Sequence, residues 1–91
     1  MSIEGTDTDL WNEIREIVAD VVEVDPDEIG PTTRFWEDLD ADSLQAIEIL
    51  SALERRFRIT IDQKLLVDMR DVQSTYRVVV RAREVMTGDG A

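Results

Sequence analysis

One short acidic segment holds three aspartates at alternate positions and a serine directly after the last of them, and these side chains offer the first chemistry to consider. The segment covers residues 38–44, reads DLDADSL and leads directly into an amphipathic stretch. Its serine hydroxyl could act as a nucleophile or as an attachment point, and its carboxylates could bind a cation.

Ser43 lacks the partners that a catalytic serine needs. The chain has no histidine and no cysteine, and its one lysine is Lys64. A serine nucleophile normally depends on a histidine or lysine base within hydrogen-bond reach, and no pattern marks an oxyanion hole. We therefore expect a non-catalytic protein, and we interpret Ser43 as an attachment point.

The alternating carboxylates do not fit a calcium-binding loop. Such a loop, counted from Asp38, needs glycine at its sixth position and glutamate at its twelfth. Ser43 and Ile49 stand at these positions, and Glu48 falls one residue short. We expect no metal site here.

A helix predicted over residues 43–57 would position the serine at its start. Asp42 or Ser43 can cap this helix, and Gln45 follows Asp42 at the spacing of a capping box. One helical stripe is apolar and should face the core: Ala46, Ile49, Leu50, Leu53 and Phe57. The opposite side carries Leu44, Ile47, Glu48, Ser51 and Arg55. Its two aliphatic residues are a candidate protein-contact patch.

The other elements complete an all-α fold, a small four-helix bundle with three long helices and one short one. Helices are predicted over residues 8–23, from Asp62 to Val67, and from near Asp71 to about Met86. A short helical turn is predicted after Pro26. A long loop joins the first two long helices, and Phe35 and Leu39 should pin it to the core. Five residues of the last helix should share one side: Val72, Tyr76, Val79, Val80 and Arg83. We expect one helical domain over residues 8–86 between flexible ends at 1–7 and 87–91.

Composition limits the partners. The chain has 91 residues and a net charge of −11. Residues 1–54 carry 16 acidic and 2 basic residues, whereas residues 55–91 carry 5 acidic and 8 basic residues. An acidic surface repels nucleic acid and anionic membranes and attracts basic protein surfaces. The sequence contains no apolar run long enough to span a bilayer and no signal-peptide pattern, so we expect a cytoplasmic protein. It gives no sign of a stable oligomer, and we expect a monomer.

The motif around Ser43 resembles that of the acyl carrier protein family. Residues 42–44 resemble its Asp-Ser-Leu attachment motif, and residues 35–39 resemble its aromatic-x-Glu-Asp-Leu lead-in. Glu48 stands five residues after the serine, as in the family, and the similarity extends over residues 8–86. It implies a four-helix bundle whose serine carries a covalent 4′-phosphopantetheine arm from coenzyme A.

The resemblance also implies partners. A phosphopantetheinyl transferase would attach the arm to Ser43, and acyl-transferring and condensing enzymes would use the acyl thioesters that the arm bears. Their basic surfaces would dock at the start of the second long helix. The docking residues expected are Asp38, Asp42, Leu44, Ile47 and Glu48.

Several residues depart from the family pattern. Asp40 stands where glycine is frequent, and Gln45 and Arg55 stand where many fatty-acid carriers have acids. The second long helix is therefore acidic at its Ser43 end and basic at its Phe57 end. We infer a carrier for a dedicated polyketide or fatty-acid-type pathway. A peptidyl or aminoacyl carrier of a nonribosomal system and an unmodified acidic helical adaptor remain as alternatives.

Overall fold

The computed structural model describes residues 8–88, and these residues form three α-helices and two short 3₁₀ helices. The elements are α1 (Thr8–Val22), η1 (Pro26–Glu28), α2 (Ser43–Phe57), η2 (Gln63–Asp68) and α3 (Val72–Gly88). No strand occurs within this described part of the chain. The predicted all-α bundle is confirmed, and the predicted bounds of α2 agree with the structure.

The ends of the chain differ slightly from the prediction. Helix α3 continues to Gly88, whereas the helix was expected to end near Met86. The flexible ends predicted for the chain fall mostly on residues 1–7 and 89–91, which lie outside the described residues. None of the described helices is long and apolar enough to cross a membrane.

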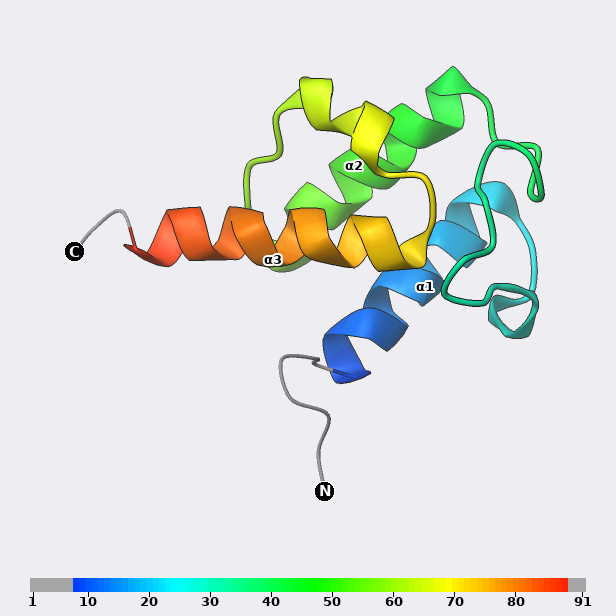
Figure 1. The fold of residues 1–91 in the computed structure, drawn as a ribbon, viewed down its shortest axis with the longest axis horizontal. Helices are drawn as coiled ribbons and strands as arrows, with labels where there is room; N and C mark the ends of the chain where they lie inside the picture. Colours follow the sequence, from blue (N-terminus) through cyan, green and yellow to red (C-terminus); the bar gives the residue numbers. More distant parts are fainter. Residues whose placement is uncertain (1–7, 89–91) are drawn as a thin grey trace.

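Apolar stripes on the three α-helices build one core. Helix α1 packs against both α2 and α3, and η2 packs against α2 and α3 (Figure 1). The stripe predicted for α2 is confirmed, because Ala46, Ile49, Leu50 and Leu53 are buried and Phe57 packs at the edge of the core. Burial of such stripes is the main stabilising contribution to a bundle of this size.

The buried side of α3 contains polar residues as well as valines. Of the residues predicted to share one side, Val72 and Val79 are buried and Arg83 is exposed, while Thr75 is fully buried. Ser74 is also buried, and its hydroxyl accepts hydrogen bonds from the N–H groups of Arg70 and Asp71 at the start of the helix. These bonds satisfy a polar side chain that would otherwise be costly to bury.

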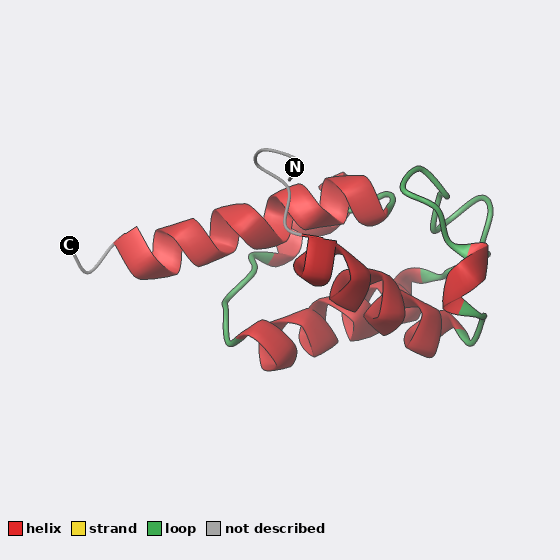
Figure 2. Cartoon of the chain, turned by 90° about the horizontal axis from the view of Figure 1, so that it is seen from below, coloured by secondary structure: helices red, strands yellow, loops and turns green. Residues whose placement is uncertain are grey.

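The long loop before α2 lies at the end of the molecule away from the last turns of α3 (Figures 1 and 2). Phe35 is buried and Leu39 packs against the core, as predicted. The Phe35 N–H donates to the Arg70 carbonyl at 2.8 Å, and the Ala41 N–H donates to the Phe35 carbonyl at 2.9 Å. The loop is therefore held in place up to the residues that precede Ser43.

Candidate functional site

Ser43 is the first residue of α2, and its side chain is exposed. Within the described residues its hydroxyl forms no hydrogen bond. A helix N-terminus presents unpaired N–H groups and the positive end of the helix dipole, which favour a nearby negative group. The hydroxyl is thus accessible at a position suited to a phosphate ester.

Asp42, and not Ser43, caps the helix. The Gln45 N–H donates to the Asp42 carboxylate at 2.8 Å, and the Asp42 N–H donates to the Gln45 side-chain oxygen at 3.2 Å. This reciprocal pair is the capping box that the spacing of Asp42 and Gln45 predicted. Because the carboxylate takes the capping role, the serine hydroxyl remains available for other chemistry.

Replacement of Asp42 should separate the cap from the charge. We expect Asp42→Ala to lower the free energy of unfolding by about 1 kcal/mol, because the helix loses its N-cap acceptor. Asp42→Asn keeps an acceptor oxygen and should lose much less. Urea unfolding followed by circular dichroism measures both, and an equal loss in the two variants would contradict the capping role.

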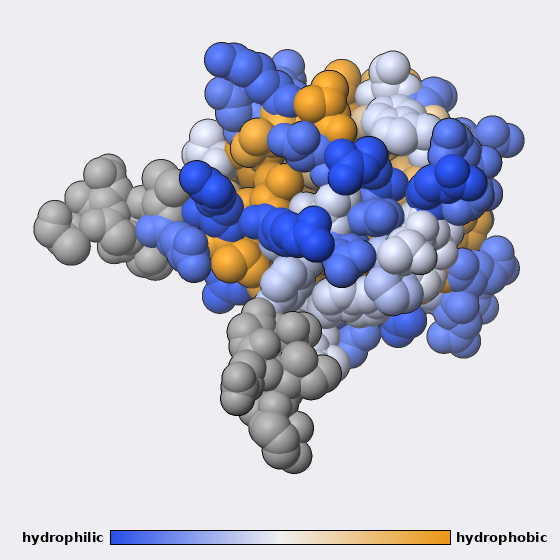
Figure 3. All heavy atoms as spheres, in the orientation of Figure 1, coloured by the Kyte–Doolittle hydropathy of each residue, from blue (hydrophilic) through white to orange (hydrophobic). Residues whose placement is uncertain are grey.

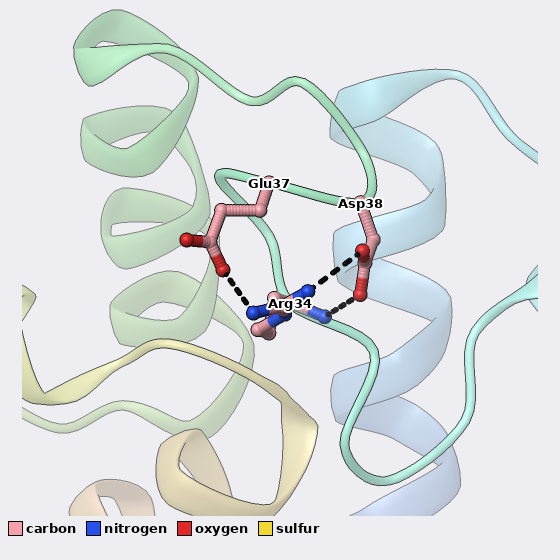
Figure 4. A network of polar contacts seen from close by, with 3 residues as sticks. All are labelled: Arg34, Glu37 and Asp38. Atoms are coloured by element: carbon pink, nitrogen blue, oxygen red, sulfur yellow. Dashed lines mark hydrogen bonds and ion pairs between the residues drawn. The ribbon is translucent and has the colours of Figure 1, made fainter.

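Asp38 is held by Arg34 within the loop (Figure 4). The Arg34 N–H donates to the Asp38 carboxylate at 2.9 Å, and the guanidinium lies 3.5 Å from the same carboxylate and 2.6 Å from that of Glu37. The backbone hydrogen bond, followed by the guanidinium, holds the pKa of Asp38 below its usual value of 3.8. Arg34 was missed in the sequence, and it offsets part of the charge that Asp38 was expected to offer a partner.

The depressed pKa of Asp38 predicts a pH-dependent effect. Ionised Asp38 contributes stability fully above its usual, unfolded-state pKa of 3.8, and this contribution is lost as the pH falls through the lower folded-state pKa. Asp38→Asn should therefore lower the melting temperature at neutral pH, and the difference from wild type should shrink in acid. Thermal melts from pH 7 to pH 2 test this expectation, with Asp20→Asn on α1 as a control. A difference that is constant with pH would rule it out.

Asp40 adopts the left-handed backbone conformation, with φ at 59°. Side chains other than glycine seldom adopt this region, although aspartate tolerates it better than most. The family's frequent glycine at this position therefore matches the conformation that the structure shows. Asp40 directs the chain from the half-buried Leu39 to the buried Ala41 and then to the cap of α2.

The outward face of α2 is apolar near Ser43. Leu44 is 64% exposed and Ile47 is 39% exposed, and Glu48 beside them is exposed. Trp36 in the preceding loop is also partly exposed, which the sequence did not indicate. We call Leu44, Ile47 and Glu48 the α2 face. The structure thus brings three of the predicted docking residues together on one helical surface next to Ser43.

The residues of the acidic segment do not gather into a metal site. Among the described residues, no group of three or more acidic side chains is arranged to hold a metal ion. By contrast, the exposed Ser43 hydroxyl can form a phosphate ester, and the unpaired N–H groups of the first turn of α2 would favour the negative charge of that phosphate.

Comparisons with known proteins agree with this geometry. The family model described as "Phosphopantetheine attachment site" matches residues 12–79. "Polyketide-8 synthase acyl carrier protein 1" of Streptomyces avermitilis is 49% identical over 80 residues, which are 88% of this chain and 95% of the relative. "Acyl carrier protein" of Petrotoga mobilis is 32% identical over 74 residues, which are 81% of this chain and 87% of the relative.

A solved structure is also similar. A chain in the structure of "The ishigamide ketosynthase/chain length factor" superposes with a TM-score of 0.70 at 38% identity. The alignment covers 84% of this chain and 96% of that chain. The segment matched by the family model includes residues 38–44 and the whole of α2.

Proposed function

Since the chain belongs to the acyl carrier proteins, whose phosphopantetheine attachment domain it contains, we propose that Ser43 carries the 4′-phosphopantetheine arm. The terminal thiol of that group holds acyl chains as thioesters, so a carrier needs no catalytic side chains of its own. A phosphopantetheinyl transferase would join the arm from coenzyme A to the Ser43 oxygen.

One observation carries this proposal. The Ser43 hydroxyl is exposed at the start of α2 and free of hydrogen bonds, while the neighbouring Asp42 caps the helix. The unpaired N–H groups of the first turn would stabilise the phosphodiester, because they and the helix dipole favour negative charge. Ser43 would therefore bind and orient the arm without loss of the cap.

We further propose that the acyl chains are polyketide intermediates. The 49% identical relative is a polyketide synthase acyl carrier protein, and the similar solved chain comes from a structure of a ketosynthase/chain length factor. Extension of an acyl group on the loaded carrier by such a condensing pair would support this pathway. Loading by an amino-acid-activating enzyme instead would favour the aminoacyl-carrier alternative. In this proposal the carrier works as a cytoplasmic monomer, beside the coenzyme A that supplies its arm.

Partner enzymes would dock on the α2 face and on the acidic residues around it. Leu44 and Ile47 would fill a shallow apolar pocket, while Glu48, Asp42 and Asp38 would meet basic residues of the partner. Contacts of this kind are weak and sensitive to salt, which suits a carrier that must leave each enzyme after transfer.

Charge reversal at Glu48 tests the electrostatic part of this docking. At low salt, Glu48→Arg should raise the KM that a phosphopantetheinyl transferase shows for this carrier by about threefold to tenfold, because one attractive charge pair becomes repulsive. The effect should shrink at 0.5 M salt, where the Debye length is only about 4 Å. Glu16→Arg makes an equal change of charge at an exposed position of α1 and should have little effect on the KM. Equal effects of the two variants would indicate that only net charge matters.

A further inference from the structure

A groove of about 620 Å³ lies between η2 and α3, away from the proposed attachment site. Its apolar floor is formed by Leu65, Val78 and Ala82. Figure 3 shows hydrophobic surface between these elements, bordered by strongly hydrophilic residues. No described residue of α2 lines the groove, so it is separate from the α2 face and from Ser43.

Basic side chains border the groove along α3. Arg77 and Arg81 stand one helical turn apart and therefore on the same side of α3, and Arg70 lies just before the helix. None of these three guanidinium groups takes part in an ion pair within the described residues. These three arginines thus gather at one groove in a chain with a net charge of −11.

Two carboxylates on the η2 side of the groove form no ion pair with these arginines. Asp62 and Asp68 also line the groove, but neither forms an ion pair across it. The Asp62 carboxylate instead accepts the Lys64 N–H at 2.9 Å and caps η2. The α3 side therefore keeps an unpaired positive charge next to an apolar floor.

We propose that this groove binds a small organic anion with an apolar body. The carboxylate or sulfonate of the ligand would contact Arg77 and Arg81, since guanidinium groups bind such anions through paired hydrogen bonds. The apolar body would cover Leu65, Val78 and Ala82. The volume falls within the range of about 300–1,000 Å³ for small-molecule sites.

This site goes beyond the carrier function and requires no prosthetic arm. The test therefore uses the Ser43→Ala protein, in which the proposed attachment is impossible. Naphthalene-2-carboxylate serves as the probe, and its neutral analogue naphthalene-2-carboxamide has the same apolar body. Amide chemical shifts in a ¹⁵N-labelled sample, followed during titration, report both the site and the affinity.

We expect the carboxylate to shift amides around Val78 and Ala82 and to bind at least about fivefold more tightly than the carboxamide, because only the anion gains charged hydrogen bonds. The double variant Arg77→Gln/Arg81→Gln should weaken carboxylate binding by about fivefold or more. Arg55→Gln/Arg56→Gln removes the same charge from α2 and should leave the affinity unchanged. Asp68→Asn removes a repelling carboxylate and should tighten binding by about twofold.

Three results would overturn the proposal. One is equal affinity for the carboxylate and the carboxamide in the otherwise unmodified groove, a comparison that needs no variant of the arginines to fold. Another is unchanged carboxylate affinity after loss of Arg77 and Arg81. The third is a groove whose amides do not shift with naphthalene-2-carboxylate but do shift when an acidic peptide is titrated. That result would identify a protein-docking surface.

Discussion

A phosphopantetheinyl transferase supplied with coenzyme A should add the mass of one phosphopantetheine to the wild-type chain and none to Ser43→Ala. The expected loss is complete, because the proposed ester needs the Ser43 oxygen and no other side chain can replace it at the start of α2. Intact-protein mass spectrometry after incubation gives the answer directly. Removal of the hydroxyl should change the free energy of unfolding by no more than about 0.5 kcal/mol, since Asp42 provides the cap.

Ser51→Ala is the matched control for this experiment. Ser51 lies on the same helix but is half-buried and two turns further along, so its loss should leave the mass gain intact. Modification that persists in Ser43→Ala would exclude Ser43 as the attachment residue. Failure of the wild-type chain with a transferase that modifies other carriers would contradict the carrier proposal itself.

Ile47→Asp should reduce the kcat/KM of partner enzymes for the loaded carrier by about tenfold or more. A partly exposed aliphatic residue at the centre of a small docking face can contribute over 1 kcal/mol to binding, and a carboxylate in its place would need to be desolvated. A phosphopantetheinyl transferase and a ketosynthase/chain length factor pair are suitable enzymes for the assay. Because Ile47 is 39% exposed, the variant should retain its helical circular dichroism spectrum.

Val67→Asp introduces the same change on another exposed aliphatic residue. Val67 lies on η2 and is 73% exposed, and we place no docking role there. The kcat/KM of the partner enzymes for the loaded Val67→Asp variant should match the wild-type value. If Ile47→Asp also turned over normally, the α2 face would not be the docking surface, although the attachment of the arm to Ser43 would be unaffected.

Helical periodicity made the main elements predictable. The apolar stripe and the capping signals defined α2 correctly, because this helix buries one side and shows the other to solvent. The sequence could not decide between Asp42 and Ser43 as the cap, since both side chains can accept a hydrogen bond from the first turn. That choice depends on the backbone conformation at residue 42, which the structure supplies.

Loop contacts and buried polar residues were less predictable. Arg34 contacts Glu37 and Asp38 at the i,i+3 and i,i+4 spacing of a helical turn, but this turn lies in a loop where no helix was predicted. In α3, the run of valines fits more than one helical stripe, so the sequence did not show which side of this helix is buried. The groove between η2 and α3 depends on tertiary packing and has no signal in the sequence.

The left-handed backbone at Asp40 has a consequence for protein engineering. Glycine there would remove the steric cost of this conformation, but it would also give the unfolded chain more conformational freedom. These opposing effects should leave the melting temperature nearly unchanged. The segment leading to Ser43 would meanwhile sample a wider range of orientations, so residue 40 offers a means to tune the reach of any group attached to that serine without redesigning the bundle.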